Sequence, residues 1–229
     1  MNRLSISFIF AIILILSTTA FSQQHTFEAG IEGGAGYAHL SGISINENDY
    51  QLKPVFSSGL TFMYNFHKHF SIRTGASFEK KGGRAQGDFP DANGNKIGEY
   101  KTDIGLDYIT VPLLIRFTQG KKIRFFGEVG PYFGRLLKST FTYSGPNVTG
   151  VLVADFTSYY KRFDIGITGD VGISLPVSKA LRLALVLRHN YGLYNIAVPQ
   201  PYADLKTNNN SNNVLIGLAY VFGTPKKTK

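Results

Sequence analysis

Short segments that alternate between apolar and polar or small residues are the feature that most constrains the fold of this chain. In residues 163–175 the odd-numbered positions are apolar apart from one glycine, and the even-numbered positions include Asp164, Thr168, Asp170 and Ser174. A period of two is that of a β-strand, whose side chains point alternately to its two faces. The chain is therefore predicted to consist of strands with one apolar and one polar face.

Eight segments follow this pattern and are joined by alternating short and long connections. We expect strands near residues 26–40, 55–66, 70–81, 105–118, 123–137, 161–175, 181–195 and 213–222. Tight turns are expected at 67–69, 119–122 and 176–180, and long loops at 41–54, 82–104, 138–160 and 196–212. Short turns at one rim and long loops at the other are typical of an outer-membrane β-barrel, whose strands cross the bilayer in about 9 to 11 residues.

Phenylalanine marks the short-turn end of six of these predicted strands. The residues are Phe27, Phe66, Phe70, Phe117, Phe125 and Phe222. Aromatic side chains gather where a membrane protein meets the headgroup region, so this pattern predicts a girdle at one bilayer interface. A less regular set predicts the opposite girdle and comprises Tyr37, Phe78, Tyr159, Tyr160 and Tyr191.

A soluble barrel with an apolar interior, as in lipocalin-like carriers, is the main alternative fold. An eight-stranded barrel has an interior just wide enough to be filled by side chains. The apolar set is bulky, with Leu60, Phe62 and Leu113 among its members, and would overfill that space. The alternate set is small or charged and fits inside. We therefore predict an all-β fold, an eight-stranded antiparallel up-and-down transmembrane β-barrel with its large residues facing lipid.

This assignment of faces places a cluster of opposite charges in the barrel interior. The cluster comprises Glu28, Glu32, Arg73, Glu79, Arg116, Arg124, Glu128, Asp164, Asp170, Arg182 and Arg188. Each base in this set is Arg rather than Lys, which suits a confined site because the guanidinium group can bond two carboxylates and stays charged. Buried charges must be paired whatever the function, so we interpret the cluster as a structural plug. A path for protons or ions is the functional alternative.

The sequence offers little sign of catalytic, cofactor or metal chemistry. It contains no Cys, which removes disulfides and thiolate metal sites. Some outer-membrane enzymes that deacylate lipid A carry a lipid-facing His with a Ser two positions later. His189 is expected to face outward, but Tyr191 stands where that Ser is needed, so the nucleophile is missing. We expect a protein that is not an enzyme and that holds no cofactor and no metal.

The first 22 residues have the form of a secretory signal peptide. A charged start with Arg3 precedes an apolar core over residues 8–16, and Ala20 and Ser22 are the small residues at the cleavage site. A spanning helix would need about 20 apolar residues, so we predict cleavage after Ser22 instead of a membrane anchor.

The barrel domain is expected to occupy residues 23–223, followed by a basic tail at 224–229. The formal net charge of the chain is +9. For an exported chain the expected counter-charge is membrane lipid and lipopolysaccharide, and nucleic acid is not expected as a partner.

Three stretches resemble the PorT family of outer-membrane β-barrel domain proteins of the Bacteroidota type. They are residues 107–116 (DYITVPLLIR), 127–137 (GEVGPYFGRLL) and 188–196 (RHNYGLYNI). The resemblance extends in order and spacing from about residue 23 to 223. It implies an eight-stranded barrel in the outer membrane of a Gram-negative bacterium and, for the founding members, a role in secretion or maturation of exported proteins. The basic tail after Phe222 departs from barrels that end on the aromatic residue read by the assembly machinery.

Two functions of different classes remain open at this point. The first is a non-enzymatic membrane module whose extracellular loops bind a protein partner or scaffold a secretion complex, and the second is a small-solute pore. A lipid-modifying enzyme is a more distant third. The charged lumen favours the first, with loops 82–104 and 138–160 supplying the contacts. Their candidate anchors, which alternatively cap the rim or touch headgroups, are Phe89, Phe141, Tyr143, Phe156 and Tyr159.

Overall fold

The computed structural model describes residues 25–42, 50–90, 92, 95–146, 148–199 and 206–222. The predicted signal peptide with its cleavage site and the predicted basic tail lie outside these residues. Among the described residues, no helix has the length and hydrophobicity needed to cross a membrane.

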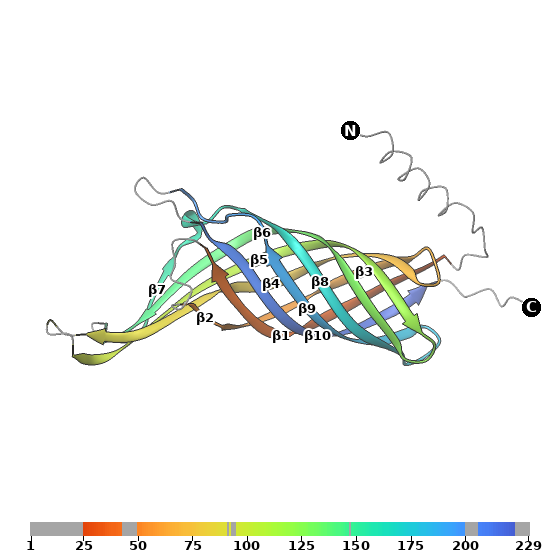
Figure 1. Ribbon diagram of the computed structural model, residues 1–229, viewed down its shortest axis with the longest axis horizontal. Helices are drawn as coiled ribbons and strands as arrows, with labels where there is room; N and C mark the ends of the chain where they lie inside the picture. The colour runs from red at the N-terminus through yellow and green to blue at the C-terminus, as the bar shows by residue number, and fades with distance from the viewer. Residues whose placement is uncertain are drawn as a thin grey trace, which may run out of the picture.

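Eight long strands form a closed antiparallel ring (Figure 1). They are β1 (Thr26–Ser41), β3 (Lys53–Asn65), β4 (Phe70–Pro90), β5 (Lys96–Gly120), β6 (Arg124–Ser144), β8 (Phe163–Pro176), β9 (Leu181–Gly192) and β10 (Asn208–Phe222). Each strand pairs with its neighbours in the ring, and β10 closes it against β1. Closure leaves no open edge in the ring, which is what a sheet in hydrocarbon requires. The predicted eight-stranded antiparallel barrel is confirmed.

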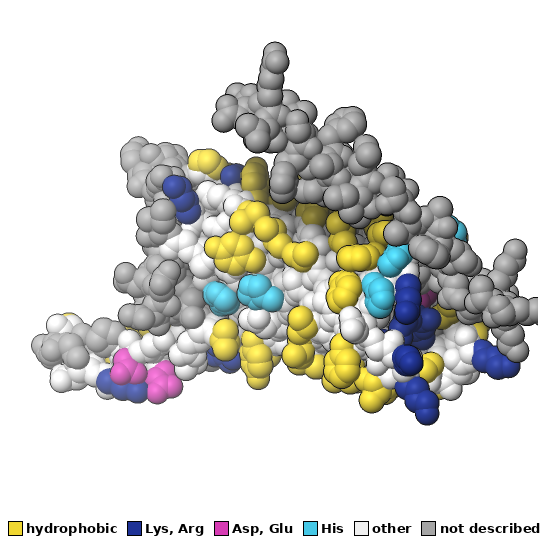
Figure 2. All heavy atoms as spheres, turned by 45° about the vertical axis from the view of Figure 1, so that its right-hand side comes forward, with side chains coloured by type: hydrophobic (Ala, Val, Ile, Leu, Met, Phe, Trp, Pro, Cys, Tyr) yellow, Lys and Arg dark blue, Asp and Glu magenta, His cyan; other side chains and the backbone are white. Residues whose placement is uncertain are grey.

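The two faces of the wall follow the predicted alternation. Leu113 on β5 is 52% exposed, whereas Thr110 on the same strand is 2% exposed and points inward. Leu185 on β9 also lies on the outer face, at 44% exposure. Figure 2 shows hydrophobic side chains gathered over the barrel wall on the face in view. The bulky apolar set therefore faces the lipid, and the soluble barrel with an apolar interior is ruled out.

The short-turn rim carries the predicted aromatic girdle. The pairing of Phe27 with Phe222 and with Tyr64 places the start of β1 and the end of β10 at this rim. The Phe70 and Phe117 rings lie 5.4 Å apart between their centroids, and both are exposed on the outer face. These rings form an apolar surface at the level where a bilayer interface is expected.

The three tight turns lie close to their predicted positions, between β3 and β4, β5 and β6, and β8 and β9. Gly120 opens the second turn with a φ of 118°, a conformation that favours glycine. A Cβ at this position would lie 2.1 Å from the Ile123 carbonyl oxygen. The turn therefore requires glycine both for its backbone conformation and for its space.

The predicted loop 82–104 is wrong, because most of it is a β-hairpin. β4 continues to Pro90 and β5 begins at Lys96, and the two strands stay paired from Gly82 with Gly105 to Phe89 with Gly98. This hairpin projects beyond the barrel at the end opposite the tight turns (Figure 1). Outside the bilayer neither face has to be apolar, so the strands lack the alternation that revealed the membrane spans.

Two other predicted loops also contain strand. β6 runs to Ser144, and the short strand β7 (Leu152–Asp155) pairs with it within the predicted loop 138–160. The 3-10 helix η2 (Thr157–Tyr159) follows. β10 begins at Asn208, within the predicted loop 196–212. A second short strand, β2 (Tyr50–Gln51), pairs with β4 outside the ring.

Candidate functional site

The predicted charge cluster lies in the barrel lumen. Nine of its eleven members are buried, and Arg124 and Arg182 are half-buried near the tight turns. The side chains come from strands around the ring, so the alternation of each strand brings together residues that are far apart in sequence. All eleven residues lie at inward-facing positions of the strands, and their role as a structural plug stays a prediction.

Arg73 on β4 stands at the centre of this cluster. Its guanidinium group bonds Glu32 on β1 and lies 2.7 Å from a Glu128 oxygen on β6 and 3.5 Å from an Asp170 oxygen on β8. Arg188 on β9 lies 2.8 Å from oxygens of both Glu32 and Asp170. We call these five residues the central network. It links five strands across the lumen, and its ion pairs are shielded from water.

A second set of ion pairs lies toward the tight turns. Arg116 bonds the second oxygen of Glu128, and its guanidinium carbon lies 3.8 Å from the centre of the Phe126 ring. Arg182 bonds Glu28, which also accepts a hydrogen bond of 2.9 Å from the Asn65 amide. Each of these two arginines therefore has a carboxylate partner in the lumen.

Lys81, which the predicted cluster does not include, also lies inside the barrel. Its ammonium group lies 3.2 Å from Asp164 and 3.7 Å from Glu79, and only 1% of the residue is exposed. The nitrogen also lies 4.2 Å from the centre of the Tyr132 ring, a cation–π contact. Lys81 is the next inward position after Glu79 and the last residue of the predicted strand 70–81, so the alternation of that strand already indicated it.

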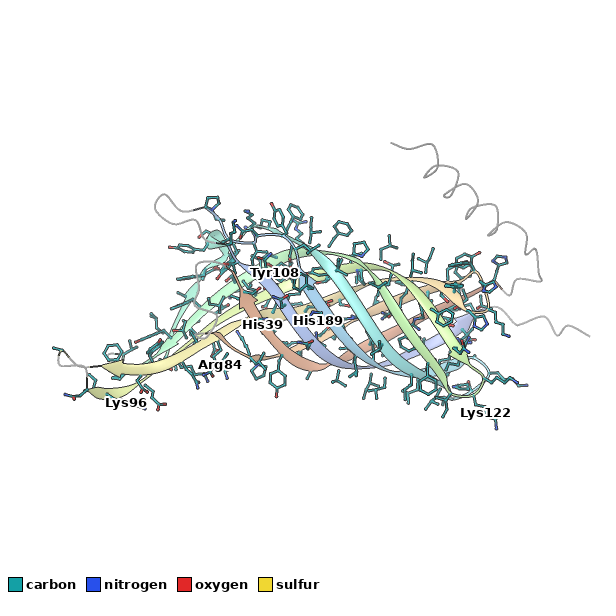
Figure 3. All side chains as sticks on the ribbon, viewed as in Figure 1. His39, Arg84, Lys96, Tyr108, Lys122 and His189 are labelled. Atoms are coloured by element: carbon teal, nitrogen blue, oxygen red, sulfur yellow. The ribbon has the colours of Figure 1, made fainter. Side chains whose placement is uncertain are left out.

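An apolar layer that the sequence did not reveal closes the lumen toward the projecting hairpin. It consists of Leu40, Ile104, Leu106, Tyr108, Leu136 and Ile196, and we call it the apolar lid. Tyr108 lies at this end of the barrel in Figure 3. The prediction missed these residues because it assigned only small or charged side chains to the barrel interior.

The connection between β9 and β10 contributes Ile196 to this lid. The Ile196 amide donates to the Thr207 carbonyl at 2.8 Å, and the Ile196 carbonyl accepts from the Lys161 amide at 2.7 Å. These backbone bonds hold the residue, which is fully buried, over the barrel mouth. The lumen is thus filled by two layers, the charged central network and the apolar lid above it.

The strands that continue past the lid form a separate exposed surface. We call it the projecting sheet: residues 84–90 of β4, 96–103 of β5 and 140–144 of β6, together with β2 and β7. Its tip is held by Lys96, whose ammonium group lies 2.7 Å from Asp88 and 2.8 Å from Glu99. These hydrogen bonds raise the pKa of Lys96 above its usual value.

The predicted aromatic anchors are only partly available on this surface. Phe141, Phe156 and Tyr159 stack in a row, with ring centroids 4.6 and 4.7 Å apart. Tyr159 is exposed at the end of the row, whereas Phe141 packs against the apolar lid. Phe89 and Tyr143 are half-buried. The nearby strand β7 is more open, since Leu152 and Val153 are both more than half exposed.

His189 lies on the outer face of β9, as predicted. Its Nδ1 atom is 2.8 Å from the Asn212 amide oxygen, and its ring lies beside that of Tyr191. Within the described part of the chain, no group of three or more His, Cys, Asp or Glu side chains is arranged to hold a metal ion.

The closed ring with lipid-facing apolar residues and a charged interior defines an outer-membrane β-barrel. The family model described as outer membrane protein beta-barrel domain matches residues 21–198, and the chain belongs to this family. The protein is located in the outer membrane of a Gram-negative bacterium. The match to this family model does not test the resemblance to the PorT family, which stays a prediction.

Several solved outer-membrane barrels are similar to this chain at low identity. The N-terminal β-barrel domain of OprF from Pseudomonas aeruginosa is 9% identical, with 88% of this chain and 100% of that chain covered and a TM-score of 0.47. Ail of Yersinia pestis, in complex with the heparin analogue sucrose octasulfate, is 13% identical, with 86% and 99% covered and a TM-score of 0.39.

Neisserial surface protein A is 15% identical, with 85% of this chain and 96% of that chain covered and a TM-score of 0.41. Among curated proteins, none matches the sequence. The family assignment of this chain therefore rests on the family model and not on these distant structural similarities.

Proposed function

We propose that the protein is a non-enzymatic outer-membrane module that binds a protein partner through the projecting sheet. The observation that carries this proposal is the continued pairing of β4 and β5 beyond the barrel, from Gly82 with Gly105 to Phe89 with Gly98. Short turns face the periplasm and long connections face outward in such barrels, so the projecting sheet faces the exterior. It offers a surface of paired strands, whereas a protein that served only as a membrane anchor would need no more than a loop there.

The edge of this sheet suits an extended segment of another protein. Among the described strands, β7 pairs only with β6, so its other edge has backbone donors and acceptors available. An exposed strand edge can accept an added strand, with main-chain hydrogen bonds giving affinity and side-chain contacts giving specificity. The exposed Leu152 and Val153 supply apolar contacts beside that edge.

The filled lumen supports binding over solute passage. A permeating solute would have to displace both the apolar lid and the central network. Breaking a buried ion pair costs about 3 to 5 kcal/mol, and Arg73 alone contacts three carboxylates. A pore is therefore the less favoured function.

Two finer assignments belong to the same proposal. The PorT resemblance supports a partner that takes part in secretion or maturation of exported proteins. Arg135 and Lys138, exposed on β6 near the outward end of the barrel, supply cations for the phosphate groups of lipopolysaccharide. The barrel would then be anchored by lipid contacts while the projecting sheet binds its partner.

Partner capture from outer membranes tests the proposal. In the test variant, residues 84–103 and residues 142–153 are each replaced by an Asn-Gly turn, which favours a tight hairpin. These changes remove the β4–β5 extension and the exposed edge of β7, and they keep Ile104 in the lid and Phe141 against it. Lys122→Gln, at a tight turn on the other side of the membrane, is the matched control. After cross-linking and mass spectrometry, we expect partners captured by the wild type and by the control to be lost from the shortened variant. Equal capture by all three proteins would contradict the proposal.

A further inference from the structure

Among the described residues, Arg124 differs from the other lumen arginines in having no carboxylate within ion-pair distance. Arg73, Arg116, Arg182 and Arg188 each pair with an acid in the lumen. For Arg124, the described residues supply neither an ion pair nor a side-chain hydrogen bond, although it is half-buried on the inner face of β6. A partly buried guanidinium group without a partner is unfavourable, and such groups are normally paired.

Arg124 faces a hollow at the tight-turn mouth of the barrel that is lined by further cations. The hollow has a volume of about 260 Å³, and its cationic lining comprises Lys68, Lys121, Arg124 and Arg182. Thr118 and His69 also line it, and its lining includes no acidic residue. Figure 2 shows Lys and Arg side chains gathered at this end of the molecule.

Two acids, Glu28 and Glu32, line the cavity next to Arg124, and both are already paired. Glu28 accepts bonds from Arg182 and from the Asn65 amide, so its charge is committed to those two groups. A smaller cavity of about 50 Å³ continues from Arg124 and Arg182 toward Arg73, with room for little more than water. Any anion that enters from the periplasm is therefore held in the outer hollow, next to Arg124.

We propose that this hollow binds a phosphate group, with Arg124 as its main ligand. A phosphate group carries up to two charges and several acceptor oxygens, which matches a guanidinium fork flanked by ammonium groups. The hollow is open to the periplasm and lies just inside the aromatic girdle formed by residues such as Phe117. The phosphate group therefore comes either from a soluble phosphorylated molecule or from a lipid headgroup of the inner leaflet.

Lys122 provides a matched control for the position of the site. It lies in the same turn as Lys121 and at the same end of the barrel (Figure 3), but it does not line the hollow. If the basic rim merely attracts anions, removing the charge of Arg124 or that of Lys122 has the same effect on phosphate affinity. If the hollow is a site, only the loss of Arg124 weakens binding strongly.

Isothermal titration of the intact barrel with inorganic phosphate, at constant ionic strength in phosphatidylcholine nanodiscs, tests the proposal. We expect one saturable site, a loss of affinity of about tenfold or more for Arg124→Gln, and a change of about twofold or less for Lys122→Gln. Circular dichroism and heat-modifiable gel mobility verify that each variant is folded. Absence of saturable binding by the wild type, or equal weakening in the two variants, overturns the proposal.

Phosphatidylglycerol nanodiscs distinguish the two sources of the phosphate group. A lipid headgroup in the hollow raises the apparent phosphate Kd of the wild type relative to phosphatidylcholine nanodiscs, and this rise is reduced in Arg124→Gln. An equal phosphate affinity in the two bilayers indicates a soluble ligand. Both results support the site. A rise of the same size in the wild type and in Arg124→Gln contradicts it, because general repulsion by the anionic surface would then explain the change.

Discussion

Individual lumen residues depend on each other because they are buried charges. Arg73→Met would leave Glu32, Glu128 and Asp170 with fewer counter-charges in a lumen that excludes water. We expect this change to lower the free energy of unfolding by about 3 to 5 kcal/mol. Urea unfolding in lipid vesicles measures the change, with Lys122→Gln as a control at an exposed position. A loss below about 1 kcal/mol would show that the network contributes little to stability.

On the outer face of the wall a charged side chain is unfavourable, because this face is in contact with hydrocarbon. Leu113→Arg should lower the free energy of unfolding by about 2 to 4 kcal/mol, because the new charge must lie in the bilayer. Leu113→Ala controls for the lost side-chain volume. Thr110→Arg places its charge in the lumen, where the Thr110 hydroxyl donates to Glu79 at 3.2 Å, and any loss there comes from crowding. Equal stabilities of Leu113→Arg and Leu113→Ala in a bilayer folding assay would contradict the assigned faces.

At the scale of strands, the apolar–polar alternation predicted the segments that cross the membrane and missed the strand segments that lie outside it. The spans carry a period of two because one face meets lipid and the other meets the lumen. Residues 84–90 and 96–103 are also strand, but they lie beyond the lid, outside the bilayer, and show no such period. Asn209 shows the same limit, because its amide donates to Asp164 at 3.1 Å in a segment that composition alone predicts to be loop.

Amide hydrogen exchange tests whether the projecting hairpin is a stable element. Paired amides in residues 82–89 should exchange much more slowly than amides in an unstructured loop, because their exchange requires opening of the hairpin. The Lys96 contacts at the tip should add to this protection, so Lys96→Gln should accelerate exchange near residue 88 without affecting the barrel strands. Complete exchange of the wild-type hairpin within seconds would show that this segment behaves as a loop.

The candidate site is likewise only partly predictable from sequence. The alternation of side chains along single strands was sufficient to place the charged residues in the lumen. The pairing of Lys81 with Asp164 joins residues 83 positions apart, and the lid combines β1, β5 and β6 with the connection after β9. Such contacts depend on ring closure, which no local pattern contains. The availability of Arg124 as a ligand likewise appears only when its neighbours are known.

At the scale of the whole molecule, we propose a barrel that anchors an external sheet and does not open a path through the membrane. The barrel stays closed in this proposal because its lumen is filled by the central network and the apolar lid. Single-channel recording of the purified barrel in planar bilayers tests this claim most directly. We predict a current that stays at the leak level of the bilayer across the applied voltages, whereas stable, reproducible conductance steps from single barrels would contradict the claim.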